Sequence, residues 1–510
     1  MTIDDETRSF AEARPGTEEA SPENRMAEAP RPRSPWVSVL VILVGSYAAV
    51  LNITVVGVAL PSVAESFGGN EAWVSVDWVV TSFLVGVVLV LPLTGWLSDR
   101  FGRKAMYVAS LTSFGVGAVM CAAAPNMVVL VIGRLIQGFG GGVLMPVGMT
   151  MVYELFPPHR RGTAMGIWGV GIMAAPAAGP PLGGWLVTVG SWRWVFGVFV
   201  VFAALAAALA LRWLPEIGHR EHRRLDPIGW VLMAIAVVAL VIGSREATEW
   251  GYDAPVTWAV VTLAVAALGL VGWRSLRRTD PIIDLGMFSV PTFRMAMIVV
   301  AFMSIGQFAQ LTFLPMELQV VRDLDAQRVG LLLMPGAIGV AAMMPIAGWL
   351  ADRVGGRLPA SIGLVINAVT MWRLGHLQPD GSERQIVEIL LVQGIGMGLV
   401  FMPTTVSAMN SLPARFVGQA AAVNNLVRQL GAAIGTAMLS AVVVASVGDV
   451  TPVGLPADES QAAYNRVFLT AFWFTVIAAI AAMVGLPGKA QAARHREERA
   501  TEQEVHGAAD

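Results

Sequence analysis

Apolar stretches of about 20 residues, the length that a helix needs to cross a bilayer, recur along this chain between short polar connections. The pattern predicts 14 transmembrane helices, at 36–61, 74–97, 105–123, 127–150, 163–188, 193–213, 228–245, 256–273, 293–316, 328–350, 359–376, 387–409, 418–447 and 466–488. We therefore expect an all-α integral membrane protein. The polar segments 1–34 and 489–510 are predicted to be cytoplasmic tails, the first of them disordered and without the apolar region of a signal peptide.

Three sequence phrases occur twice, in the same order and about 255 residues apart. GWLSDRFGRK at 95–104 returns as GWLADRVGGR at 348–357, and IQGFGGGVLMP at 136–146 returns as VQGIGMGLVFMP at 392–403. The third pair is Pro157…Gly162-Thr-Ala164 and Pro413…Gly418-Gln-Ala420. This repeat predicts two six-helix bundles in tandem, at 35–214 and 293–488. The segment 215–292 is expected to be a linker with two extra transmembrane helices that face lipid.

Basic residues concentrate in one set of connections, which the positive-inside bias assigns to the cytoplasm together with both termini. This set contains Arg100, Arg103, Lys104, Arg160, Arg161, Arg220, Arg223, Arg224, Arg274, Arg277, Arg278, Arg353, Arg357 and Arg415. The opposite connections hold little beyond Arg245, Arg322, Arg328 and Arg384.

The composition excludes several other classes of protein. Only 14% of the residues are charged and the net charge is −2, so no basic surface for nucleic acid is expected. Cys121 stands alone in an apolar run, and His219 and His222 share a basic loop, so we predict neither a disulfide nor a metal site. The chain has no GxxxxGK[ST] phrase for ATP and no HExxH or nucleophile–base constellation, so neither an ATP-driven pump nor an intramembrane enzyme is expected, and no cofactor.

The first repeated phrase resembles the signature between helices two and three of the major facilitator superfamily. The matching residues are Gly95, Asp99, Arg100, Gly102, Arg103 and Lys104, and the second copy keeps Asp352 and Arg353. The glycines permit a tight turn. The aspartate can pair with cations or with a helix N-terminus across the two halves, which would latch one conformation. The alternative is that the cluster only obeys the positive-inside bias.

A second signature of that superfamily is matched by RLIQG in the fourth predicted helix. Because charge inside a membrane span is expensive, Arg134 is a functional candidate, with Gln137 on a nearby helical face. The resemblance implies a role for Arg134 in proton movement. The alternative is a structural hydrogen-bond hub.

The fifth predicted helix resembles the antiporter signature of exporters in the superfamily. Its glycines and prolines are Gly171, Pro176, Gly179, Pro180, Gly183 and Gly184. Small residues at every fourth position let another helix approach closely, and prolines remove backbone hydrogen bonds and bend the helix. The alternative is an ordinary packing interface.

Further phrases are similar to the fourteen-span drug:proton antiporter branch, whose members expel lipophilic, often cationic compounds. These are LNITVVGVALP at 51–61, WVVTSF at 78–83, WRWVF at 192–196, DPIIDLGMF at 280–288 and NNLVRQLGAAIGTAM at 424–438. In many relatives, however, the residue equivalent to Asn52 is an aspartate, and some carry a second one at the position of Thr81.

Since Asn52 cannot titrate, the carboxyl group that couples protons must lie elsewhere. Glu317 is our main candidate and Asp77 the second, and Asp99 of the latch could also titrate. Glu317 could instead pair with Arg322, and Asp77 could simply cap its helix. Other polar positions are candidates for a substrate cavity: Asn52, Gln137, Gln307, Gln310, Asn424 and Arg428. Arg428 could bind substrate or only brace helix ends.

These observations predict a monomeric, proton-driven exporter of small lipophilic or cationic compounds in a bacterial plasma membrane, working by alternating access. A dedicated exporter of one endogenous metabolite, antibiotic or lipid remains open because of Asn52, and so does a membrane sensor without transport.

Overall fold

The structure, a computed structural model, describes residues 34–67, 70–217, 224–250, 254–278, 280–447 and 456–493. Every regular element in this part of the chain is helical. The elements are α2 (Pro35–Phe67), α3 (Asn70–Val90), η1 (Leu91–Leu93), α4 (Thr94–Phe101), α5 (Arg103–Ala122), α6 (Met127–Leu155), α7 (Arg161–Val189), α8 (Trp192–Trp213), α9 (Pro227–Trp250), α10 (Pro255–Ser275), η2 (Leu285–Ser289), α11 (Pro291–Phe308), η3 (Ala309–Phe313), α12 (Leu314–Val320), α13 (Ala326–Val354), α14 (Arg357–Leu374), α15 (Glu383–Asn410), η4 (Ala414–Phe416), α16 (Val417–Val447) and α17 (Ala457–Gly485).

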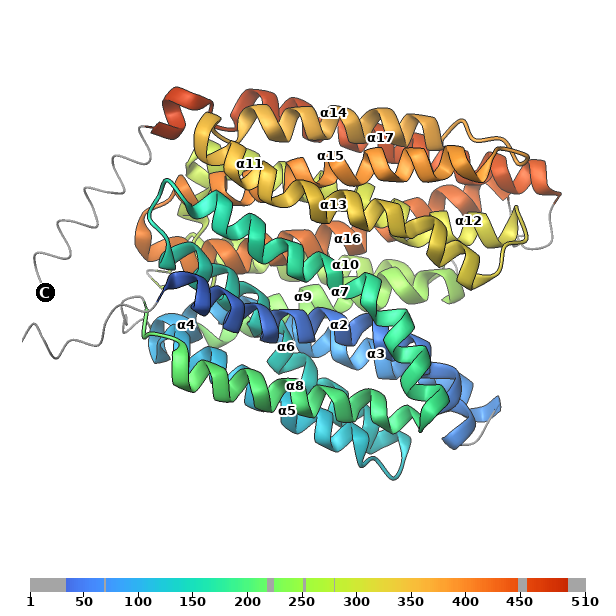
Figure 1. Cartoon of the computed structure of the whole chain (residues 1–510), viewed down its shortest axis with the longest axis horizontal. Helices are drawn as coiled ribbons and strands as arrows, with labels where there is room; N and C mark the ends of the chain where they lie inside the picture. Colours follow the sequence, from blue (N-terminus) through green and yellow to red (C-terminus); the bar gives the residue numbers. More distant parts are fainter. Residues whose placement is uncertain are drawn as a thin grey trace, which may run out of the picture.

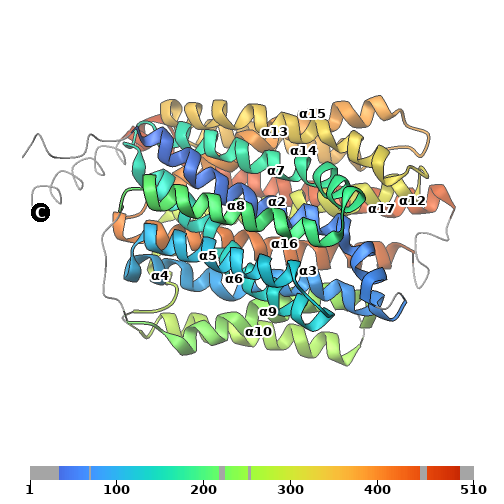
Figure 2. The ribbon, with the colours of Figure 1, turned by 60° about the horizontal axis from the view of Figure 1, so that its bottom comes forward.

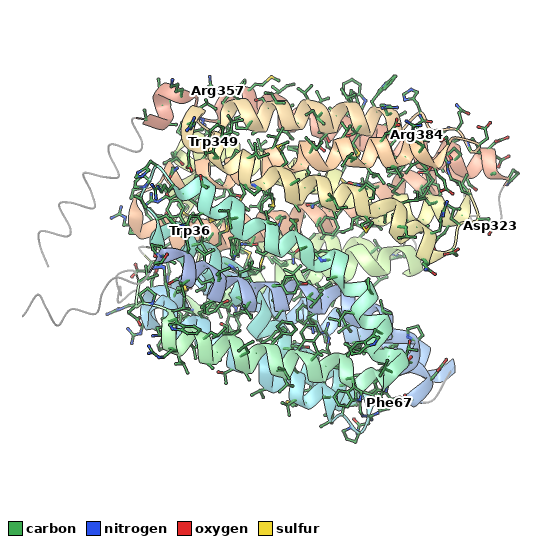
Figure 3. All side chains as sticks on the ribbon, in the orientation of Figure 1. Trp36, Phe67, Asp323, Trp349, Arg357 and Arg384 are labelled. Carbon is green, nitrogen blue, oxygen red and sulfur yellow. The ribbon has the colours of Figure 1, made fainter. Side chains whose placement is uncertain are left out.

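The helices form two bundles side by side, α2 to α8 and α11 to α17 (Figure 1). We call the end where α2 begins and α17 ends the proximal end, at the left of Figure 1, and the other the distal end. Trp36, Trp349 and Arg357 lie at the proximal end, whereas Phe67, Asp323 and Arg384 lie at the distal end (Figure 3). The all-helical, multi-pass prediction is thus confirmed.

Of the described helices, 11 are long and apolar enough to cross a membrane, and α7 raises the number to 12 if its two parts count as one span. These parts meet at 45° between Pro176 and Pro181, where the prolines lack the N–H groups of a regular helix. The described apolar part of α9, Pro227–Leu240, is shorter than a span. The total of fourteen spans therefore stays a prediction.

Close helix contacts in both bundles depend on glycine. Gly86 of α3 faces the backbone of α6, and a Cβ on it would lie only 3.0 Å from the Phe139 nitrogen. In the second bundle, a Cβ on Gly394 of α15 would lie 3.1 Å from the Gly336 Cα of α13. Since lipid competes with apolar side chains, close backbone packing of this kind holds membrane helices together.

The apolar core shows where the bundles are joined. One buried cluster runs from the first bundle, through Met165 and Met344, into the proximal part of the second bundle around Met409. The distal part of the second bundle has a separate cluster, around Phe313 and Phe468. The continuous packing between bundles therefore lies toward the proximal end.

The two-helix insertion lies along one flank of the molecule (Figure 2). α10 packs on α9. α9 also contacts α3 of the first bundle and α16 of the second, so α9 touches both bundles. The indole of Trp230 donates to the Leu89 carbonyl at 2.8 Å. Of the expected lipid-facing hairpin, α10 is thus the outer helix, while α9 covers the line where the bundles meet.

An ion pair joins the two ends of this hairpin at its proximal base. Asp226, just before α9, accepts from the Arg274 Nε at 2.9 Å and from the Gly229 backbone at 3.1 Å. Burial alone would raise the pKa of Asp226, but these hydrogen bonds and the charges of Arg274 and Arg278 outweigh it and lower the pKa. The carboxylate therefore stays charged over the physiological pH range and holds α9 to α10.

Candidate functional site

The second repeated phrase reaches across to the other bundle. Asp352, at the end of α13, accepts hydrogen bonds from the Gly162 N–H, the Thr163 N–H and the Thr163 hydroxyl, each at 2.8 Å. These donors are the first residues of α7, where free N–H groups and the helix dipole favour an anion. The carboxylate thus docks on a helix N-terminus of the opposite half.

Glycines make this docking possible. Gly348 and Gly162 approach so closely that a Cβ on Gly348 would lie 2.6 Å from the Gly162 carbonyl carbon. Gly355 ends α13 with φ 84°, a left-handed conformation that favours glycine. The tight, close-packed turn predicted from the phrase is therefore present in the second copy.

The first repeated phrase has the related arrangement at α16. Gly102 ends α4 with φ 88°, and the buried Asp99 lies beside the start of α16, where a Cβ on Gly418 would be 3.6 Å from its Oδ1. Arg103 forms an ion pair with Glu154 of α6 at 2.8 Å.

The other basic residues of the two phrases point to different partners. Lys104 donates to the Leu211 carbonyl at the end of α8 at 3.0 Å. Arg100 is exposed. Arg353 lies over the Trp349 ring, 4.1 Å from its centroid. These three are therefore placed around the latches and do not bridge the bundles in the described structure.

A further contact between the bundles joins Tyr153 of α6 to Asn410 of α15. The Tyr153 hydroxyl donates to Asn410 Oδ1 at 2.5 Å, and Arg161 donates to the same hydroxyl at 3.1 Å. Sequence reasoning missed this pair. A signal was present, because Tyr153 follows Pro146, and Asn410 follows Pro403, by the same number of residues.

Arg134 is buried in the first bundle and bonded only to neutral groups among the described residues. Its Nε donates to the Val79 carbonyl at 2.8 Å, and its Nη1 donates to Asn52 Oδ1 at 2.5 Å and to Gln137 Oε1 at 2.8 Å. The guanidinium also lies 4.3 Å from the Phe83 ring centroid. Asn52 and Gln137 thus hold the arginine inside the bundle, and neither is exposed.

Glu317 is fully buried at the distal end of the second bundle. Its Oε1 accepts from the Gln461 Nε2 at 2.9 Å, and its Oε2 has no hydrogen-bond partner among the described residues. Arg322 donates instead to the carbonyls of Gln378, at 2.8 Å, and Gly381. The partner of Glu317 is therefore the neutral Gln461 of α17, and not Arg322.

A π-helical turn lies just before Glu317, in η3. Pro315, which follows it, has no N–H to donate, so the regular hydrogen-bond ladder is interrupted there. Gln310 lies in this turn and Gln307 just before it, both half-buried. π-turns within helices are frequent at functional sites.

Arg428 lies on α16 among polar residues. Its Nη2 donates to Asn425 Oδ1 on the same helix at 2.8 Å, and its guanidinium lies 5.4 Å from the Phe401 ring centroid. Asn424 donates to the Thr405 hydroxyl of α15 at 3.2 Å. Among the described residues, no hydrogen bond from Arg428 braces another helix.

The small-residue face of α7 packs on α2. A Cβ on Gly183 would lie 2.9 Å from the Val55 carbonyl oxygen, and those on Gly171 and Gly179 would overlap Leu43 and Thr54. A Cβ built on Gly184 would have no atom within 4 Å, so Gly184 is not part of this contact. Pro176 is exposed at the bend. Two candidate side chains, Asp77 and Pro180, lie outside the described residues.

Comparisons with known proteins agree with these motifs. The sequence model of the Major Facilitator Superfamily matches residues 42–436. The chain is 32% identical to the uncharacterized MFS-type transporter YhcA of Bacillus subtilis, over 80% of this chain and 77% of that protein. It is 28% identical to the multidrug export protein EmrB of Haemophilus influenzae, over 78% of each chain.

Solved structures share the fold at lower identity. The human organic anion transporter MFSD10 superposes with a TM-score of 0.61 at 17% identity, over 88% of this chain and 100% of that one. The proton:xylose symporter XylE superposes with a TM-score of 0.59 at 18% identity, over 86% of this chain and 94% of that one.

Proposed function

The chain belongs to the major facilitator superfamily, as a multi-pass membrane transporter and not an enzyme, and on this premise we propose that it is a proton-coupled exporter of small lipophilic or cationic compounds. Export would proceed by alternating access, in which the two bundles rock around a site between them. Relatives named multidrug export or resistance proteins support this substrate class. The drive is the proton gradient, without a cofactor, and the working unit is a monomer.

We assign the proximal end to the cytoplasm, because the arginine-rich connections predicted to be cytoplasmic include Arg357 at that end. The described structure would then be the state closed to the cytoplasm. Residues 35–214 and 293–488 would be the rocking units and 215–292 the linker, with 14 spans in a lipid bilayer.

The observation that carries alternating access is the docking of Asp352 across the two halves, with Asp99 in the equivalent place of the other half. Asp352 of the second half binds the start of α7 in the first half, and Asp99 of the first half lies at the start of α16 in the second half. When both leave their helix ends, the cytoplasmic side can open without unfolding either bundle. The α7 face packed on α2 resembles the exporter signature and supports outward transport.

Glu317 is the group that we propose to carry the proton. A carboxyl group with a neutral partner on one oxygen and, among the described residues, none on the other can hold a proton without breaking an ion pair. It lies at the distal end next to a π-helical turn, a feature frequent at functional sites, and a rearrangement of that turn would be needed to open the buried carboxyl group to the outside. Arg134 would tune this step from the other bundle, where Asn52 is a neutral partner and no carboxylate among the described residues bonds it.

Proton release from inside-out vesicles with a respiration-driven gradient, read by a pH-quenched dye, tests the proposal. A panel of lipophilic cations, lipophilic anions and neutral amphiphiles is added one compound at a time. We expect at least one class to trigger protein-dependent release, and Glu317→Gln to reduce it about tenfold or more. Glu388→Gln, at an exposed glutamate of the same bundle, is the matched control and should leave it unchanged.

Two outcomes would count against different parts of the proposal. If no compound releases protons from vesicles that contain folded protein, proton-coupled export is wrong. If release is the same in Glu317→Gln as in the parent protein, antiport stands and Glu317 is not the coupling group.

A dedicated exporter of one metabolite, antibiotic or lipid is the second candidate function. The contact that favours it is Asn52 on Arg134, since a neutral amide replaces the titratable group of generic drug exporters. Release by one narrow chemical class and by no other would select this alternative.

A further inference from the structure

Arg428 points into the angle between the two bundles. One turn before it on α16, Asn424 bonds Thr405 of α15, whereas Asn425 lies with its Nδ2 4.0 Å from the Met149 sulfur of α6. Arg428 follows these residues by four and three positions, so it shares the face that both define. The side chain therefore faces both α15 of its own bundle and α6 of the other.

This position is distal to the contacts that close the proximal end. Gly95 of the first latch packs against Gln419, near the start of α16. A Cβ built on Gly95 would lie 3.0 Å from the Gln419 side chain. Arg428 is nine residues farther along a helix that rises about 1.5 Å per residue, so it stands about 13 Å above the latch. A compound bound between the bundles would meet this guanidinium above the closed gate.

The electrostatics of the two interior arginines differ from those of the proximal ones. Arg103 has Glu154 and Arg274 has Asp226 as carboxylate partners. Among the described residues, the partners of Arg428 are the Asn425 amide and the Phe401 ring. Arg134 likewise bonds only neutral acceptors there. Charge inside a membrane protein is expensive unless it is paired, and among the described residues Arg428 has no carboxylate partner, so an anionic ligand could pair with it.

We propose that Arg428 binds an acidic group of the exported compound, so that the favoured substrates are lipophilic anions. The ligand would carry a carboxylate, sulfonate or phosphate on Arg428 and an apolar body against Phe401 and Met149. Charge-assisted hydrogen bonds from a guanidinium to such groups are among the strongest available to a protein. This inference rests on the proposed export function and narrows its substrate class from lipophilic or cationic to lipophilic and anionic.

Two ions of nearly equal size and opposite charge, tetraphenylborate and tetraphenylphosphonium, test the proposal. Their binding to the purified full-length protein in detergent is measured by equilibrium dialysis, with empty micelles as the blank. We expect tetraphenylborate to bind at least about tenfold more tightly. Since this ion offers no hydrogen-bond acceptor, the measurement isolates charge. An aryl sulfonate measured beside it should gain from the guanidinium hydrogen bonds as well.

Variants separate Arg428 from the rest of the protein. Arg428→Gln should weaken borate and sulfonate binding about tenfold and leave phosphonium binding unchanged or tighter. Arg428→Lys should keep most of the borate affinity but lose part of the sulfonate affinity, because a lysine keeps the charge without the fork of donors. Arg384→Gln, at an exposed distal arginine, removes the same charge and should change nothing.

The outcomes decide between this inference and the proposed function. Equal or tighter binding of the phosphonium ion to the parent protein, or an equal effect of Arg428→Gln on both ions, would overturn the anion site. If Arg428→Gln does not fold, the binding of the two ions and the sulfonate to the parent protein and to Arg428→Lys still tests the anion site. Anion binding without proton release in vesicles would support the anion site and reject proton antiport. Proton release by cations alone would support proton antiport and reject the anion site.

Discussion

The two latches occupy equivalent places in the repeat but are held by different interactions. In the second copy, Asp352 takes three hydrogen bonds from the start of α7, and Gly348 packs against Gly162. In the first copy, the buried Arg103 forms an ion pair with Glu154, whose side chain is 18% exposed, beside Asp99. The second copy has Gly356 and Ser411 at the positions of that pair, so it cannot form it.

The two copies of one duplicated phrase therefore join the bundles through two different kinds of interaction. The second latch depends on backbone contact, which tolerates no added volume, and on one carboxylate. The first latch adds a pair of charges, and because this pair is mostly buried, salt can screen it only in part. We therefore expect the two latches to respond differently to steric, charge and salt perturbation.

The largest effect should come from filling the glycine contact of the second latch. Gly162→Val would push its side chain into the Gly348 carbonyl and Asp352, and overpacking of this kind costs about 1–3 kcal/mol. The proximal end should then stay open and transport should fall tenfold or more, since about 1.4 kcal/mol corresponds to a factor of ten. Maleimide labelling of Ala422→Cys, in a Cys121→Ser background, reports the opening.

A matched substitution on the partner helix tests whether volume alone matters. Gly330 of α13 has no atom within 4 Å of a built Cβ. Gly330→Val should therefore leave labelling and transport close to those of the parent protein. Equal loss in both valine variants would show that the glycine contact is not what closes the gate.

Neutralising the latch aspartates should come next in size. Asp352→Asn loses the charge that accepts three donors, and hydrogen bonds to a charged group contribute about 1.5–3 kcal/mol. We expect a roughly tenfold rise in Ala422→Cys labelling and a smaller rise for Asp99→Asn, because Arg103 and Glu154 still act in the first copy. A larger effect of Asp99→Asn would mean that the first latch dominates closure.

Much of this arrangement follows from sequence. The first copy of GWLxDR predicted a tight turn with Gly95 and Gly102, and an aspartate that pairs with cations or with a helix start across the halves. The structure has the corresponding turn of the second copy at Gly355 and its aspartate on a helix start. These features were predictable because they depend on local backbone geometry and on a repeated motif. The small-residue spacing of α7 likewise indicated a close helix contact, although it did not say which helix.

The partners of single polar residues could not be predicted in the same way. The sequence offers Arg322, a near neighbour, as the alternative partner of Glu317. The chain turns at Asp323, which has φ 53°, and Arg322 bonds a loop instead. The observed partner, Gln461, comes from a helix 144 residues away. Such a contact depends on how helices pack, and no local pattern encodes it.

The smallest of the three effects should come from the ion pair of the first latch, and it is the one that salt can change. Arg103→Gln and Glu154→Gln remove either side of the 2.8 Å contact. Coupling energies of exposed pairs are about 0.2–1 kcal/mol. Because this pair is mostly buried, a double-mutant cycle on Ala422→Cys labelling should give a coupling near the upper end of that range, about fivefold. Since salt screens a mostly buried pair only in part, the coupling should fall modestly as ionic strength rises, whereas the Gly162→Val effect should not change. If the cycle showed no coupling between Arg103 and Glu154, Arg103 would close the gate by packing and not by charge, and the two latches would then work in the same way.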